Sequence, residues 1–309
     1  QAEALTSNDQ VHTALQAGRY REVEAFYEKL RKDRTRQADG VFLFEKFYYA
    51  VYWYSSSDPN DASYWPKIDA ATQAWVTHSP KSHLAAMTRA FALTYRGEVL
   101  QARGGSWAEV NRFASEARRL VDGSRGAGAG DVLWHATRLR VAGLQGVPRA
   151  EVVAMIEAAA QVDPYPMRLW LEASVALSPS GENGEDLVWL MKFAAERTAG
   201  QEGTSMQARV LHAAFWRFHQ FLASPFGSTS LRWRELHESF QDWKRRYPDG
   251  YRLDLHGAMA CAARDRKVTA NVLAQTGEPS ADIWDRIGGK NYAARCRKWA
   301  SGSAEAPTT

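Results

Sequence analysis

The chain is poor in cysteine and has no long hydrophobic run. Cys261 and Cys296 are the only two cysteines among its 309 residues. No stretch approaches the roughly 18 consecutive apolar residues that a membrane-spanning helix needs, so membrane insertion is not expected. The alternation of apolar and polar residues that marks a β-strand is nearly absent as well. What remains is a globular composition, with 45% hydrophobic and 24% charged residues, which excludes a disordered or fibrous protein.

The chain also lacks a large excess of positive or negative residues. Lysine and arginine number 39 against 35 aspartate and glutamate residues, and the basic residues are spread along the chain. A nucleic-acid-binding protein usually concentrates its basic residues on one face. We therefore expect no nucleic-acid partner, and we interpret the short basic runs as solvated helix ends.

The motifs of the common enzyme classes are absent. There is no His-Glu-x-x-His pair for a catalytic zinc and no Gly-x-Ser-x-Gly turn for a nucleophilic serine. His212 and His219 lie seven residues apart, and no carboxylate or cysteine lies at ligand spacing beside them. A glycine-rich segment at 123–130 lacks the preceding strand and the Gly-Lys-Ser/Thr ending of a phosphate loop, which favours a linker. The sequence therefore predicts no catalytic residue, no metal and no cofactor.

Helical periodicity, in contrast, runs through nearly the whole chain. Apolar residues recur at intervals of three and four, and glycine or proline separates the periodic stretches. We predict an all-α fold of about sixteen helices. Helical repeats are expected over residues 1–122 and 131–300, continuous as one solenoid through the glycine-rich segment, with a disordered tail at 301–309.

An internal repeat supports the solenoid. Each of three prolines precedes a predicted helix, and the prolines lie 84 residues apart, at Pro80, Pro164 and Pro248. Eleven residues after each proline stands an apolar residue, in order Phe91, Val175 and Met259. This spacing indicates a unit of four helices, arranged as two antiparallel hairpins, that stacks into a solenoid with a continuous concave face.

One segment resembles the second half of a tetratricopeptide repeat. In residues 17–30, Gly18 and Tyr20 stand where that family turns between its two helices, and Tyr27 stands where it packs an aromatic ring. Larger side chains replace the family's small alanines at two positions, Val23 and Leu30. The resemblance implies antiparallel helix hairpins in a diverged tetratricopeptide-like array.

A longer resemblance covers most of the chain from about residue 15 to 300. The run at 258–265 and the aromatic and cysteine positions after it resemble the C-terminal end of the bacterial proteins grouped as domain of unknown function 4034. Residues 78–80 and 102–105 resemble the middle of that family. The resemblance implies a fold only, since the family carries no established activity.

Aromatic residues are abundant, with 12 each of Trp, Tyr and Phe. They concentrate in a helix predicted at 41–54, where one aromatic stripe suits the core of a solenoid and three residues point elsewhere. Rigid aromatic side chains dominate protein interfaces. Our candidates for partner-binding anchors are therefore Tyr49, Trp53, Tyr54, Trp107 and Trp233. The alternative is that these side chains also belong to the core.

The two cysteines bear on the compartment. Cys261 and Cys296 form a disulfide if the protein is exported, and they are two small buried side chains if it is cytoplasmic. The chain begins at Gln1, which fits a cleaved signal peptide or a cloning boundary. We expect a periplasmic protein, with the cytoplasm as the alternative.

These observations favour a non-enzymatic helical-repeat protein that binds another protein. A helical array offers a large preformed surface, and aromatic anchors lose little entropy on binding. The specific form of this hypothesis is an immunity protein whose one protein partner is a toxin secreted by the same bacterium. The alternative is an enzyme or a glycan-binding protein with its site in a groove between helices. The oligomeric state stays open.

Overall fold

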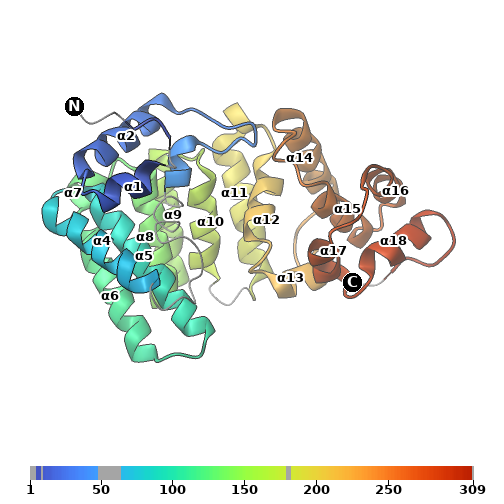
Figure 1. Cartoon of the computed structure of the whole chain (residues 1–309). Helices are drawn as coiled ribbons and strands as arrows, with labels where there is room; N and C mark the ends of the chain where they lie inside the picture. Colours follow the sequence, from blue (N-terminus) through green and yellow to red (C-terminus); the bar gives the residue numbers. More distant parts are fainter. Residues whose placement is uncertain (1–4, 8–9, 48–63, 179–181, 308–309) are drawn as a thin grey trace. The chain divides into compact units, whose positions relative to one another are not determined.

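The helical character of the sequence determines the fold. The computed structural model describes residues 5–7, 10–47, 64–178 and 182–307 (Figure 1). Within these ranges it contains seventeen α-helices, a short 3-10 helix at Leu43–Lys46 and no β-strand. A single isolated bridge pairs Arg36 with Phe42. The prediction of an all-α protein is confirmed.

The chain divides into two compact units. The first comprises residues 1–37 and 41–176, and the second comprises residues 38–40 and 177–309. The segment at 123–130, predicted to be a linker, lies inside the first unit and contains a short helix, α7 (Arg125–Gly128). A Cβ atom on Gly128 would lie 2.3 Å from the ring of Trp134. This glycine is therefore required by close packing, and it does not mark a flexible connection.

The first unit is built from helices that pack on their neighbours in the chain. They are α1 (Val11–Gln16), α2 (Tyr20–Asp33), α4 (Tyr64–His78), α5 (His83–Ala102), α6 (Trp107–Gly123), α7, α8 (Val132–Gln145), α9 (Arg149–Val162) and α10 (Met167–Leu177). Helix α5 lies at the centre, since it contacts α4, α6 and α8. Twelve of its twenty residues are buried, as expected for a helix that is apolar on nearly every side.

The turn between α1 and α2 lies in the segment that resembles a tetratricopeptide repeat. Gly18 adopts a φ of +68°, a left-handed conformation that glycine takes without a steric penalty. After the turn, the apolar positions of α2 face the interior, with Val23, Phe26 and Tyr27 buried. The segment therefore contains a turn at Gly18 followed by an amphipathic helix.

A buried charge network crosses the interior of the first unit. The guanidinium of Arg140 donates to Glu98 at 2.6 Å, to Glu172 at 3.1 Å and to the hydroxyl of Thr94 at 3.0 Å. Arg168 forms an ion pair with the same Glu172 at 2.9 Å. Both guanidiniums lie over the ring of Phe91, at 4.4 and 4.7 Å from its centre. The network joins α5, α8 and α10 by charge and by ring stacking.

Each of the three prolines spaced 84 residues apart precedes a helix. Helices α5, α10 and α15 (Leu253–Ala262) begin within a few residues of the three prolines spaced 84 apart. The apolar residues that recur eleven positions after each proline, Phe91, Val175 and Met259, are all buried. These three residues therefore pack inward, each from its own helix.

The second unit has its own set of helices. They are α11 (Gly184–Glu202), α12 (Met206–Ala214), α13 (His219–Ala223), α14 (Trp233–Arg246), α15, α16 (Arg266–Gln275), α17 (Ala281–Gly288) and α18 (Tyr292–Ala300). A disulfide joins Cys261 in α15 to Cys296 in α18, with the Cα atoms 6.1 Å apart. Both cysteines are fully buried, so the bond lies in the apolar interior of this unit.

The end of the chain carries no helix within residues 301–307, which are mostly exposed. None of the helices in the described ranges combines the length and the apolar character that crossing a membrane requires.

A histidine cluster in the second unit predicts a loss of stability in mild acid. Burial lowers the pKa of His256 to about 3, and the neighbouring His237 and Lys244 lower it further, while Asp265 opposes them. Burial also lowers the pKa of His212 to about 4. An unfolded chain takes up protons at histidine near pH 6.5, so unfolding consumes protons below that pH. The free energy of unfolding should fall as pH drops from about 6.5 towards 4, by about 1.4 kcal/mol per pH unit for His256 alone.

Urea unfolding of the wild type and of His256→Gln across this pH range measures the effect. The variant should show a shallower dependence on pH, because one proton fewer is taken up on unfolding. Parallel pH curves for the two proteins would contradict the prediction.

Candidate functional site

The exposed face of α6 carries a tryptophan in its first turn. The buried residues of this helix, among them Val110, Phe113 and Ala117, face α5 and α8. Trp107 precedes the buried Val110 by three residues and the buried Ala114 by seven, so it borders the buried side of the helix, yet it is 62% exposed. A large apolar side chain left in water is a common mark of an interaction surface when other features accompany it.

The same face of α6 leads from Trp107 to a pocket. Arg118 lies eleven residues further along the helix, which is about three turns and about 16 Å, so both side chains emerge on one side. The residues between them on this side, Asn111 and Ser115, are also exposed. Ala114, which lies between them in the same row, is buried, so the exposed strip from the tryptophan to the arginine runs along one edge of the helix.

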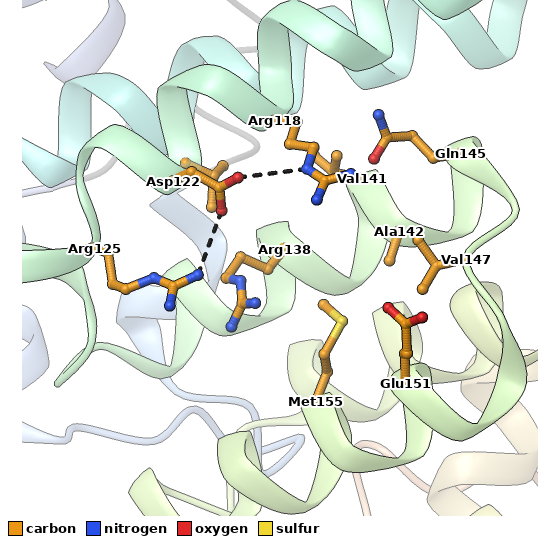
Figure 2. Close-up of a pocket in the computed structure, with 11 residues that line it drawn as sticks. Arg118, Asp122, Arg125, Arg138, Val141, Ala142, Gln145, Val147, Glu151 and Met155 are labelled. Carbon is orange, nitrogen blue, oxygen red and sulfur yellow. Dashed lines mark hydrogen bonds and ion pairs between the residues drawn. The ribbon is translucent and has the colours of Figure 1, made fainter.

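The pocket has a volume of about 150 Å³ and is formed by side chains from α6, α7, α8 and α9 (Figure 2). Its lining is cationic along one part and apolar along another. The charged lining consists of Arg118, Asp122, Arg125, Arg138 and Glu151, and the remaining lining of Val121, Val141, Ala142, Gln145, Val147 and Met155.

Two of the three arginines share a single carboxylate. Asp122 lies 3.4 Å from Arg118 and 3.7 Å from Arg125, as the dashed lines in Figure 2 show. All three side chains are largely exposed, so each pair contributes less than about 1 kcal/mol to stability. The arginine side chains are therefore available to a ligand without a large loss of folding energy.

Arg138 is the third arginine, and its environment differs. Its guanidinium lies over the ring of Trp134, 5.1 Å from the ring centre. It forms no hydrogen bond and no ion pair with any residue in the described ranges. Burial lowers the pKa of Arg138, and the positive charge of Arg125 lowers it further. A cation in this position gains from any anion that enters the pocket.

The ring beneath Arg138 is fixed by the end of α6. The indole N–H of Trp134 donates to the carbonyl of Val121 at 3.2 Å and to the hydroxyl of Ser124 at 3.0 Å. These bonds satisfy polar groups at the C-terminal end of α6, where carbonyls lack helical partners. Trp134 is buried, so the cationic part of the pocket rests on a rigid floor.

The predicted anchors have different environments. Tyr49, Trp53 and Tyr54 lie outside the described residues. Trp107 is exposed at the start of α6. Trp233 is half-buried, and its N–H donates to Asp265 at 2.9 Å while its ring packs on His237. Of the candidates in the described ranges, Trp107 alone presents a largely exposed ring.

Sequence reasoning missed the arginines and one further tryptophan. Arg118, Arg125 and Arg138 come from three helices, and nothing in the sequence indicates that they converge. Trp216, in the second unit, is 52% exposed and stacks under the guanidinium of Arg286 at 4.5 Å. It follows the buried Phe215, and it was not singled out from the sequence.

A second hollow in the first unit contains a histidine held by a buried carboxylate. Asp131 accepts hydrogen bonds from the hydroxyl of Tyr27 at 2.8 Å and from the ring of His83 at 3.1 Å. His83 lines a shallow hollow of about 480 Å³ together with Glu28 and Ser82. Ser82 accepts a bond from the backbone of Ala85 and caps α5, so this hydroxyl has a structural role.

Within the described ranges, no group of three or more histidine, cysteine, aspartate or glutamate side chains could hold a metal ion. Comparisons with protein-family models, with curated proteins and with solved structures find no match to this chain. The resemblances to tetratricopeptide repeats and to domain of unknown function 4034 therefore stay predictions.

Proposed function

We propose that this chain is a non-enzymatic helical protein whose function is to bind another protein. The observation that carries the proposal is the exposed Trp107, followed on the same face of α6 by an arginine-lined pocket. Tryptophan and arginine are the residues most enriched among those that dominate binding energy at protein interfaces. A fixed helix presents both with little loss of conformational entropy on binding.

The charges of this surface define the partner. The pocket offers three arginines against two carboxylates, so the partner should present an acidic group there and an apolar surface for Trp107. The short distance between the two features, about 16 Å along α6, suits a single contact of ordinary interface size.

The proposal has a more specific form. We propose a solenoid of helical repeats that acts in the periplasm as an immunity protein, with a secreted bacterial toxin as its one partner. The disulfide between Cys261 and Cys296 supports an oxidising compartment, where such bonds form and persist. The buried position of Phe91, Val175 and Met259 supports equivalent repeating units.

Replacing Trp107 with alanine should weaken partner binding at least tenfold without lowering stability. The ring is mostly in water, so its removal creates no cavity, whereas a buried interface anchor contributes 2 kcal/mol or more, or about 30-fold in affinity. The measurement is quantitative mass spectrometry of proteins captured by tagged wild type and by Trp107→Ala. Lysate and envelope fractions of the source bacterium supply the partner.

Trp216→Ala is the matched control, because it removes the other largely exposed tryptophan of the described chain from a different unit. A protein that the wild type and Trp216→Ala capture equally, and that Trp107→Ala loses, supports the proposal. Equal capture by all three proteins would contradict it.

The second candidate function is an enzyme or a glycan-binding protein with a site between helices. The pairing of His83 with the buried Asp131 beside an open hollow favours the enzyme, since a buried carboxylate fixes the orientation of a basic imidazole. A small molecule or a glycan that copurifies in place of a protein partner would favour this alternative.

A further inference from the structure

The pocket beneath the end of α6 has the properties of a site for a specific chemical group. It contains the cationic side chains Arg118, Arg125 and Arg138, and beside them the apolar side chains of Ala142, Val147 and Met155, with the carboxylate of Glu151 among these (Figure 2). Of these arginines, Arg138 has no hydrogen-bonding or ion-pair partner in the described chain and is partly buried. An anion is the group that would complete this arrangement, because a planar guanidinium donates two parallel hydrogen bonds to a carboxylate.

We propose that this pocket binds a carboxylate attached to a small apolar group. The inference rests on the proposed function in one respect: the C-terminal carboxylate of a protein partner, next to an aliphatic side chain, is the source that the position of the pocket favours. A free aliphatic carboxylic acid has the same chemistry and is the other source.

The charges of the pocket select a single negative charge. Three arginines against Asp122 and Glu151 leave a net charge of +1, from +3 and −2. A monoanionic carboxylate balances this charge, whereas a phosphate dianion or a nucleic-acid backbone would bring excess negative charge close to Glu151. The acidic residues therefore make the site selective for a carboxylate over more highly charged anions.

The apolar part of the pocket selects the neighbouring group. Val121, Val141 and Ala142 are buried, and the flexible thioether of Met155 lies between Arg138 and Glu151. The volume of about 150 Å³ matches a cavity size that binds a ligand of about six carbon atoms in another protein. A branched aliphatic side chain is of this size, and methionine adapts to such shapes readily.

The location relative to Trp107 connects this site to the partner-binding face. Trp107 and Arg118 project from one side of α6, about three turns apart. In the proposed complex, the partner covers Trp107 and places its chain end in the pocket. The Trp107 contact supplies most of the affinity in this arrangement, and the pocket selects the partner by its carboxylate.

The experiment titrates the purified full-length protein with small probes, followed by NMR or calorimetry. N-acetyl-leucine provides a carboxylate beside a branched side chain, and N-acetyl-leucine amide lacks only the charge. The acid should bind with a dissociation constant of about 1 mM, as expected for a ligand of about twelve heavy atoms, and the amide should bind at least tenfold more weakly. Inorganic phosphate should also bind at least tenfold more weakly than the acid.

Two variants connect the binding to the pocket. Arg138→Met keeps the length and apolar character of the side chain over Trp134 but removes the charge, so it should weaken binding of N-acetyl-leucine at least tenfold. Glu151→Gln removes the nearby negative charge and should strengthen binding two- to fivefold. Arg149→Met removes an exposed arginine from the start of α9 that does not line the pocket, and it should leave binding unchanged.

The outcomes separate the sources and the two proposals. Stronger binding of N-acetyl-leucine than of 4-methylpentanoate indicates a peptide C-terminus, and the reverse indicates a free acid. The inference would be overturned if the acid and the amide bound equally, or if phosphate bound more tightly than the acid. It would also be overturned if N-acetyl-leucine did not bind at a concentration about tenfold above the expected dissociation constant. Because these titrations use no protein partner, their failure leaves the Trp107 experiment unaffected, and a failed capture experiment leaves the pocket chemistry standing.

Discussion

Replacing Glu172 with leucine is expected to lower the free energy of unfolding of the first unit by about 3–5 kcal/mol. Glu172 is 1% exposed and forms ion pairs with two arginines, Arg140 at 3.1 Å and Arg168 at 2.9 Å. Its removal leaves both guanidiniums buried with one carboxylate fewer. A buried charge that loses its partner destabilises the folded state far more than the intact pair stabilises it. Urea unfolding followed by tryptophan fluorescence measures the difference.

The same substitution at an exposed glutamate provides the control. Glu157 lies on the solvent side of α9, so Glu157→Leu should change the unfolding free energy by less than about 0.5 kcal/mol. Combining Glu172→Leu with Arg140→Met should destabilise by less than the sum of the two single changes, because the double variant removes one charge of each sign. A loss below about 1 kcal/mol for Glu172→Leu would contradict the role assigned to this network.

This network shows what the sequence could not predict. Helices follow from spacing within a short segment, and the buried apolar positions of α2, Val23, Phe26 and Tyr27, were recognisable from their interval alone. Arg140 and Glu172, in contrast, are separated by 32 residues and carry charges that usually face water. Their burial depends on how α8 and α10 pack, which no local pattern encodes.

In the candidate site, too, one part was predictable from the sequence and the other was not. Trp107 was identifiable because it is an aromatic residue in the first turn of a helix that begins after Ser106. The glycine-rich segment at 123–130 was considered as a phosphate-binding loop and interpreted as a linker. The structure instead places its Arg125 beside Arg118 and Arg138 at the pocket. The convergence of three helices is a tertiary property, so the sequence contained the residues of the site but not their arrangement.

Reduction of the disulfide is expected to lower the stability of the second unit by about 3–4 kcal/mol. The bond from Cys261 to Cys296 closes a loop spanning 35 residues, which contains α16 and α17. Closing a loop of this length lowers the conformational entropy of the unfolded chain. The free energy of unfolding therefore rises. The effect should appear as a lower urea midpoint for the wild type in the presence of dithiothreitol.

The variant with both Cys261→Ala and Cys296→Ala separates the cross-link from other effects of the reductant. Alanine introduces no hydroxyl into the apolar interior, so the variant should match the reduced wild type and should not respond to dithiothreitol. Alkylation before reduction, followed by intact mass measurement, should find no free thiol in protein purified from an oxidising compartment. A wild type that unfolds at the same urea concentration with and without reductant, and that takes up alkyl label before reduction, would contradict both the bond and the periplasmic proposal. The bond joins α18 to α15. If α18 unfolds at a lower urea concentration than the rest of the second unit after reduction, the cross-link stabilises the end of the chain locally.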